Sequence, residues 1–231
     1  MVSRKQDIDA LLGRATKDIA DVERKYEESL QKKAVAADLR IDIKNLCENL
    51  RSALDYIAHD IREHHRPSAR RAPFYFPIFP DRKQFETKME ERFPGLRKSA
   101  PALWDLLESR EPYQKGYEWL GQFNRVNTEN KHGQLVEQTR VETPRVNVAS
   151  AGGGQVSWDP RAVKFGSGVS IHGVRVDPRT QLPHPDGAIR VDKVVWVDFL
   201  FADLGVSALG LLRSALKGVA AIAADVRKHL K

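Results

Sequence analysis

The sequence contains a single cysteine, Cys47, among its 231 residues. One cysteine cannot form a disulfide within the chain, so a small secreted fold held together by disulfides is excluded. It cannot build a zinc cluster either, and the adjacent pair His64-His65 lacks further partners at the spacing of metal ligands. We therefore expect a reducing, cytoplasmic environment and no metal site.

Long apolar runs are also missing. The most apolar stretch, Val206 to Leu230, is interrupted by five charged residues, so it falls short of the roughly 20 apolar residues that a membrane-spanning helix needs. The first residues, Met1 to Asp7, lack the apolar segment of a secretion signal. We expect no membrane partner.

Glycine-rich nucleotide-binding loops and serine hydrolase signatures are absent as well. Gly152-Gly153-Gly154 is not followed by a lysine and a helix, as a phosphate-binding loop would be. No motif of the nucleophile-elbow type surrounds a serine. We expect no cofactor.

What the chain does have is a globular composition with excess positive charge. Hydrophobic residues make up 41% and charged residues 30%, with a formal net charge of +7 and a pI of about 9.5. That balance fits a folded protein with a substantial core. A basic chain favours polyanionic partners such as nucleic acid if its charge is clustered. The alternative is a basic protein that binds nothing acidic.

Two amphipathic patterns predict long helices in the N-terminal half. Apolar residues recur at spacings of three and four from Ile8 to Leu30, and again from Leu39 to Ile61. Two such helices in succession favour an antiparallel hairpin, and Pro67 ends the second helix. The continuous apolar stripes favour a homodimer or a protein partner on the hairpin.

Prolines and short apolar patterns characterise the middle of the chain. Three prolines in the segment 72–80 forbid a regular helix, and its aromatic residues predict an extended segment packed on the helices. Shorter helices are predicted over 85–93, from Pro101 onward and over 117–126. The polar run 127–133 then ends at Gly133, a plausible helix stop.

From Leu135 the pattern changes to strands. Alternating residues predict strands around 141–148, over 169–176 and over 189–199, with a loop at 177–187. The short connections favour a small antiparallel sheet of three to five strands. A final amphipathic helix starts near Ser207. We predict an α+β fold in one compact unit, with a helical bundle over 1–134 and a sheet plus C-terminal helix over 135–231.

The first candidate site is the run from Arg125 to His132. It gathers Arg125, Asn127, Asn130, Lys131 and His132 within eight residues. Cleaving RNA without a metal requires a proton acceptor, a proton donor and cations that stabilise the phosphorane. Histidine titrates near neutrality, and arginine and lysine supply charge and hydrogen-bond donors. The alternative is an ordinary polar helix end, where Lys131 and His132 favour the negative pole of the helix.

This run carries a family resemblance. Arg125 and His132 are separated by six residues, which resembles the arginine–x(4–6)–histidine motif of the HEPN superfamily. The segment 50–56, followed downstream by 130–132, is similar to uncharacterised bacterial and phage-associated proteins related to that group. The motif usually has a polar residue directly after the arginine, where this chain has Val126. The resemblance covers about residues 1–135.

The resemblance implies a helical bundle that acts as a metal-independent endoribonuclease in a bacterial defence or toxin–antitoxin system, or an inactive relative of one. Such proteins commonly dimerise, so that two motifs form one composite site. His132 would then act as acid or base, Arg125 would stabilise the phosphate charge, and Asn130 and Lys131 would position the substrate.

A second candidate lies on the second helix, where Arg51, Asp55 and His59 share one side at spacings of four. Asp55 would orient the imidazole of His59. The alternative is a solvated helix face with ion pairs between successive turns.

A third candidate is the basic loop after that helix. Arg66, Arg70 and Arg71 are available for phosphate contacts, and the aromatic residues 74–76 follow at once, where bases can stack. The alternative for those aromatic residues is core packing. The sequence thus leaves two functions open: an RNA-cleaving protein, or a non-enzymatic module that binds protein or nucleic acid through the hairpin and the basic loop.

Overall fold

The computed structural model describes residues 4–32, 37–65, 74–132, 138–150, 152–184, 189–201 and 204–230. Its contacts divide the chain into two compact units, which we call the helical unit (Met1–Thr139 with Leu200–Lys231) and the β unit (Arg140–Phe199). The predicted α+β class is confirmed. The predicted single compact unit is wrong, and the C-terminal helix belongs to the helical unit instead of the β-rich part.

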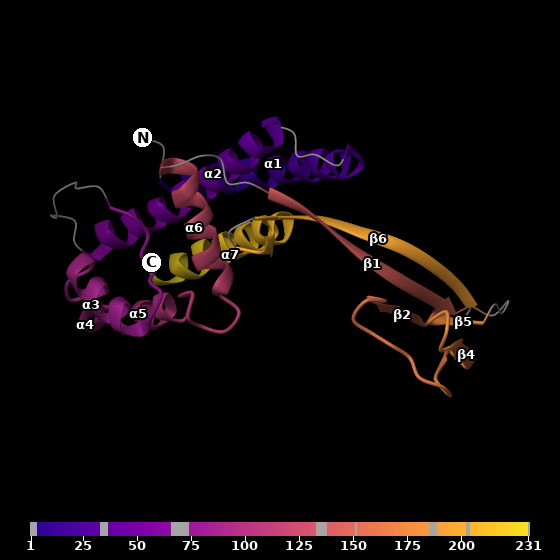
Figure 1. Cartoon of the computed structure of the whole chain (residues 1–231). Coiled ribbons are helices and arrows are strands. Elements are labelled where there is room, and N and C mark those ends of the chain that lie inside the picture. Colours follow the sequence, from indigo (N-terminus) through magenta and orange to yellow (C-terminus); the bar gives the residue numbers. More distant parts are fainter. Residues whose placement is uncertain are drawn as a thin grey trace. The chain divides into compact units, whose positions relative to one another are not determined.

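The predicted helical hairpin is confirmed. Helices α1 (Arg4–Lys32) and α2 (Ala37–His65) pack along each other, side by side in Figure 1. The apolar stripe of α2 is buried over its whole length, because α6 and α7 cover it in addition to α1. The apolar stripe of α2 therefore gives no support for a dimer, because it already packs against helices of the same unit.

Helix α7 (Ala208–His229) packs against α1, α2, α5 and α6. It begins where the hydroxyl of Ser207 accepts a hydrogen bond from the Gly210 amide at 3.1 Å, the usual role of serine before a first helical turn. A β-carbon on Gly218 would lie 2.0 Å from the ring of Trp119 on α6 (Glu118–His132). Glycine is therefore required here by close helix packing.

Between α2 and α6 lie three shorter helices, α3 (Arg82–Arg92), α4 (Leu96–Ser99) and α5 (Pro101–Glu108). The side chain of Asp81 caps α3 by accepting from the Gln84 amide. Proline opens α5, as predicted. Helix α6 continues to His132, so most of the polar run after Val126 is helical.

The β unit is built on two long strands, β1 (Gln138–Ser150) and β6 (Ile189–Phe201). With β2 (Gln155–Trp158) they belong to a sheet of order β2-β1-β6-β7. The last strand, β7 (Val206–Ser207), is part of the helical unit, where it pairs with Leu200 and Phe201. Strands β3 (Ser170–Ile171), β4 (Val174–Asp177) and β5 (Leu182–Pro183) form a second sheet. The core of this unit consists of Val146, Val148, Trp158, Ile171 and Val176.

One predicted strand is wrong. The alternating segment 169–176 is a hairpin whose strands β3 and β4 pair antiparallel, Ile171 with Val174. The two turn residues, His172 and Gly173, have φ of 50° and 80°. Positive φ at both central positions matches the right-handed twist of hairpin strands, so the turn interrupts an alternation that otherwise reads as continuous.

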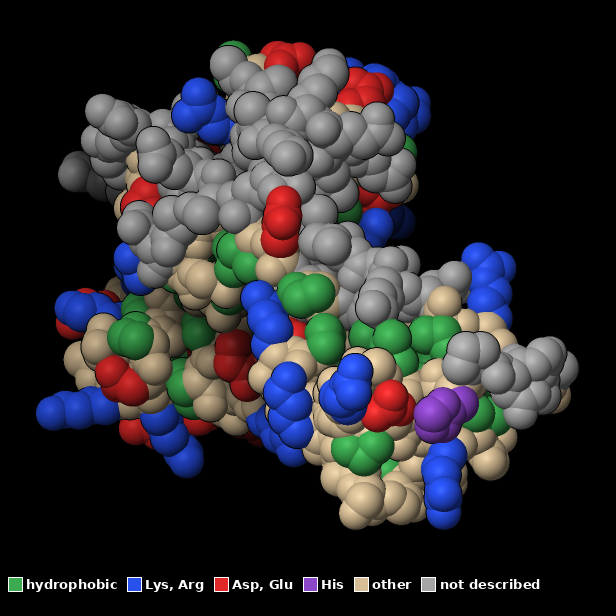
Figure 2. Space-filling view, turned by 45° about the vertical axis from the view of Figure 1, so that its right-hand side comes forward, with side chains coloured by type: hydrophobic (Ala, Val, Ile, Leu, Met, Phe, Trp, Pro, Cys, Tyr) green, Lys and Arg blue, Asp and Glu red, His purple; other side chains and the backbone are tan. Residues whose placement is uncertain are grey.

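Surface charge is mixed on the face that Figure 2 presents: lysine and arginine side chains are interspersed with acidic ones. Among the described side chains of that face, no single patch of one sign stands out, so a polyanion site has to be sought locally. Over the described ranges, no helix is both long and apolar enough to cross a bilayer.

Candidate functional site

An extended segment, residues 74–79, crosses the helical unit without belonging to a sheet. Pro77 within it and Pro73 and Pro80 at its two ends prevent regular structure, so its backbone groups need other partners. The Phe76 amide donates to Oδ1 of Asp55 at 2.8 Å, and the Phe76 carbonyl accepts from Nη2 of Arg51 at 3.2 Å. Two side chains one turn apart on α2 thus hold both backbone groups of one residue.

Arg51 is the central buried cation of this region, with only 8% of the residue exposed. Besides Phe76 it contacts Asp55 at 3.2 Å and donates to Oδ1 of Asn124 on α6 at 3.0 Å. Burial lowers the pKa of Arg51, while the charge of Asp55 opposes that change. An arginine stays charged even so, and its contacts fix the guanidinium in place.

Further along the segment, the Phe79 amide donates to Oε2 of Glu111 at 2.6 Å. Glu111 is 2% exposed, and burial raises the pKa of its carboxyl to about 8. The Phe79 amide and the charge of Arg92 act in the opposite direction but are weaker. Glu111 therefore carries a proton at neutral pH and does not neutralise Arg92.

On α6, one polar face looks towards this segment. Asn124, Asn127 and Thr128 lie at spacings of three and four, which place them on the same side of the helix. The hydroxyl of Thr128 donates to the Asn124 carbonyl at 2.8 Å. Asn127 is 3% exposed, and its Oδ1 has no hydrogen-bond partner among the described residues.

These elements enclose a pocket of about 390 Å³, which we call the α6 pocket. It lies between α2, the extended segment, the end of α3 and α6. Its lining is formed by Arg51, Tyr75, Phe76, Ile78, Arg92, Asn124, Asn127 and Thr128.

The α6 pocket joins positive charge, an aromatic surface and amide groups. Arg51 supplies a fixed guanidinium, and Arg92 supplies an exposed one whose centre lies 5.3 Å from the ring of Phe79. Tyr75 is 56% exposed at the wall. Ligand pockets commonly combine an apolar or aromatic surface with a few placed polar groups. This combination suits a ligand with both an anionic group and a planar ring.

Asn127, one of the residues predicted from the polar run, lines this pocket. Arg125 does not line it: its side chain is 52% exposed and donates to Oε1 of Glu129 at 2.8 Å along the helix. Asn130, Lys131 and His132 form the last turn of α6, directly after Thr128, but their side chains lie outside the described residues. The catalytic role of His132 stays a prediction.

The second candidate site, Arg51, Asp55 and His59, does not form one cluster in the structure. Arg51 and Asp55 pair, but their side chains are only 9% and 16% exposed, so the expected solvated face is wrong at these two positions. His59 instead stacks edge-on against Phe74, with ring centres 5.9 Å apart. The third candidate, Arg66, Arg70 and Arg71, lies outside the described residues.

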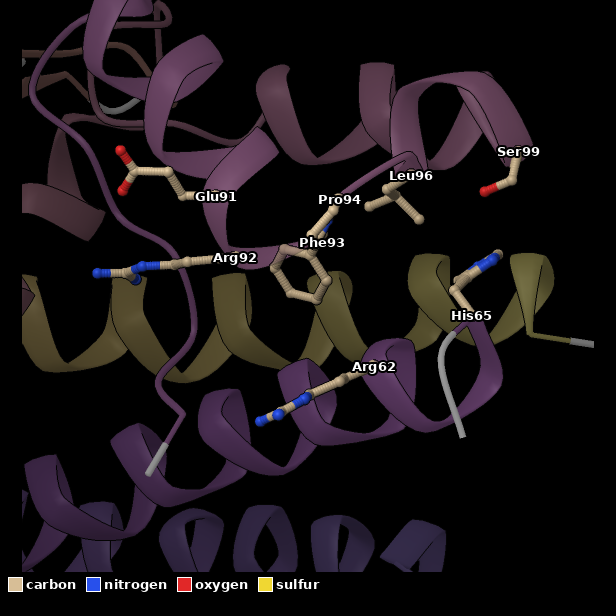
Figure 3. A pocket seen from close by; sticks show the side chains of 8 residues that line it. All are labelled: Arg62, His65, Glu91, Arg92, Phe93, Pro94, Leu96 and Ser99. Carbon is tan, nitrogen blue, oxygen red and sulfur yellow. The ribbon is translucent and has the colours of Figure 1, made fainter. Parts of the chain in front are cut away.

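A smaller pocket of about 160 Å³ lies on the other side of Arg92, between the end of α2 and the loop after α3. Figure 3 shows Arg62 and His65 on α2, opposite Phe93 and Leu96. Arg92, at the end of α3, contributes to both pockets.

Three residues of the α6 pocket, Arg92, Asn124 and Thr128, were missed from the sequence. Glu111 was also missed; it does not line the pocket but accepts from the Phe79 amide. Asn124 and Thr128 had a usable signal, because they share a helical face with Asn127. Arg92 had none, since only tertiary packing places it here.

Metal ligation finds no support in the part of the chain that the structure describes, where no three histidine, cysteine or acidic side chains are grouped to hold an ion. Comparison of the chain with family models, with curated proteins and with solved structures gives no significant match.

Proposed function

We propose that the helical unit binds RNA at the α6 pocket and acts as a metal-independent endoribonuclease of the HEPN type. The observation that supports this is the pocket itself. It presents two arginines and an exposed tyrosine beside the polar face of α6, and Asn130-Lys131-His132 form the last turn of that helix. Arginine is suited to phosphate, and aromatic side chains stack on bases.

In this proposal His132 accepts the proton of a ribose 2′-hydroxyl as the 2′-oxygen attacks the neighbouring phosphorus. The bond from phosphorus to the 5′-oxygen breaks, and the leaving oxygen takes a proton from a second acid. The products are a 2′,3′-cyclic phosphate and a 5′-hydroxyl. In the composite sites that the HEPN resemblance implies, the second acid is the His132 of another copy. Arginine and lysine stabilise the charge of the phosphorane.

The experiment is cleavage of end-labelled RNA in excess EDTA, comparing the unaltered protein with His132→Ala. His229→Ala is the matched control, because His229 lies in the last turn of α7 and does not line the pocket. We expect cleavage that leaves a 2′,3′-cyclic phosphate, lost in His132→Ala and retained in His229→Ala. Cleavage unchanged in His132→Ala would contradict the proposed role of that residue.

A second candidate function is RNA binding without cleavage. It is favoured by the position of Arg125, which pairs with Glu129 and does not line the pocket. The binding groups of the α6 pocket are thus independent of the motif arginine. RNA bound tightly but left intact in the same assay would support this function.

A further inference from the structure

The side chain of Asn127 has an amide oxygen without a hydrogen-bond partner among the described residues. Asn127 is 3% exposed, lines the α6 pocket, and its Oδ1 has no donor within the described ranges. Buried polar atoms nearly always have a partner. Its neighbours in the helix, Phe123 and Val126, are fully buried apolar residues, so a leucine would satisfy packing as well. An N–H donor from a ligand in the pocket would complete the hydrogen bonding of Asn127.

The two arginines of the pocket, Arg51 and Arg92, have different roles. Arg51 is held by Asp55, Asn124 and the Phe76 carbonyl, so it acts mainly as a rigid part of the wall. Arg92 is exposed and forms no ion pair with any described carboxylate within 4.0 Å. Its guanidinium is the group that can turn to an incoming phosphate.

Tyr75 supplies a flat surface at the pocket wall. It is 56% exposed, the most exposed of the large hydrophobic residues described, and its ring centre lies 6.0 Å from the guanidinium carbon of Arg51. Its neighbours Phe76 and Phe79 are buried. An exposed tyrosine that directly precedes buried anchors of the same segment offers a pre-positioned stacking surface.

Size restricts the occupant. A volume of about 390 Å³ is near the lower end of the roughly 300–1,000 Å³ found for ligand pockets. That space fits one nucleotide, not a duplex. In duplex RNA the base edges are paired and poorly accessible, whereas unpaired bases can be splayed out and read on their edges.

We propose that the α6 pocket is a base-reading subsite for one unpaired RNA nucleotide: Asn127 accepts an N–H from the base, Tyr75 stacks on the ring, and Arg92 binds its phosphate. This rests on the proposed function for the identity of the ligand as RNA, but it does not require cleavage. Asn127 then sets base preference, while Tyr75 and Arg92 set affinity for all bases.

The test is fluorescence anisotropy with short labelled RNA homopolymers of A, C and U in EDTA, using His132→Ala as the background so that cleavage does not interfere. We expect the background protein to prefer one homopolymer by about tenfold, the usual scale for one buried hydrogen bond. Asn127→Leu, which removes the acceptor at similar volume, reduces that preference to about twofold or less. Asn45→Leu is the matched control, because Asn45 is an exposed asparagine on α2 that does not line the α6 pocket, and it keeps the preference.

Surface variants test the other two contacts without endangering the fold. Tyr75→Ser should weaken binding of every homopolymer by about tenfold, while Tyr56→Ser, an exposed tyrosine on α2 that does not line the pocket, leaves binding unchanged. Arg92→Gln should weaken all homopolymers alike and reduce the dependence of affinity on salt.

Two outcomes would overturn the inference. The first is binding without base preference; the second is a preference that Asn127→Leu leaves intact in a folded protein. Should Asn127→Leu fail to fold, equal binding by Tyr75→Ser and the Tyr56→Ser control would overturn it. The two proposals can fail separately. If the unaltered protein cleaves RNA but Asn127→Leu keeps the base preference, only the base-reading subsite is refuted. If base preference depends on Asn127 but the unaltered protein does not cleave RNA, only the nuclease is refuted.

Discussion

Glu111 should make the stability of the helical unit decrease as pH rises. Its carboxyl is 2% exposed and has a pKa of about 8, against an ordinary value of 4.5. Between those two values the folded state holds a proton that the unfolded state has released, so the free energy of unfolding falls as pH increases. The contribution of Glu111 to the free energy of unfolding is fully present below about pH 4.5 and is lost as pH rises towards 8.

The magnitude follows from the width of that interval. At about 1.36 kcal/mol per pH unit, it corresponds to at most about 5 kcal/mol between pH 4.5 and pH 9. Glu111→Gln keeps an oxygen that accepts from the Phe79 amide and has no proton to lose. The variant should match the unaltered protein within about 1 kcal/mol at pH 5 and exceed it by several kcal/mol at pH 9.

Urea unfolding followed by circular dichroism at pH values from 5 to 9 measures this effect, because the helices of the helical unit dominate that signal. Glu108→Gln is the matched control: its carboxylate lies 3.2 Å from Nε of Arg82 and is more exposed, at 17%. The control should have a profile parallel to that of the unaltered protein. A parallel profile for Glu111→Gln as well would refute the reasoning.

Two further predictions concern the packing of Gly218 and the hydrogen bonds of Arg51 and Asp55 to the Phe76 backbone. Gly218→Ala should destabilise the protein by about 1–3 kcal/mol or more, because the new β-carbon meets the ring of Trp119. Gly13→Ala is the control and should stabilise it by about 0.5–1 kcal/mol, because no heavy atom lies within 4 Å of its β-carbon. Thermal unfolding compares the two variants, and equal melting temperatures would contradict the predicted packing of Gly218. Asp55→Ala leaves the buried Arg51 without its carboxylate and should cost about 3–5 kcal/mol, measured by urea unfolding, and a loss below about 1 kcal/mol would mean that the pair does not hold the segment.

Local periodicity was enough to predict the helices and the extended segment. The stripes of α1 and α2 and the prolines of segment 72–80 each encode their structure within a few turns or residues, and the buried Phe76 and Phe79 confirm the predicted packing. The turn at His172-Gly173 was missed, because alternation continues on both sides of it. The assignment of α7 to the helical unit depends on contacts with residues far away in the sequence, which no local pattern contains.

The candidate site was only partly predictable for the same reason. Arg51 sits opposite an apolar stripe, where helices are normally solvated, yet Phe76 and Asn124 cover it from elsewhere in the chain. Asn127 was found because the polar run around it is local. Arg92 reaches the pocket only through the fold, and nothing in its own surroundings distinguishes it from other arginines.

The most direct test of the central claim is to locate bound RNA by photo-crosslinking. RNA carrying 4-thiouridine is irradiated with the His132→Ala protein in EDTA, and the crosslinked peptides are identified by mass spectrometry, with Tyr75→Ser in parallel. We expect adducts on the extended segment that carries Tyr75 and on α6 around Asn127, with the Tyr75 adduct lost in the variant. Crosslinks confined to the β unit, or unchanged in the variant, would contradict it.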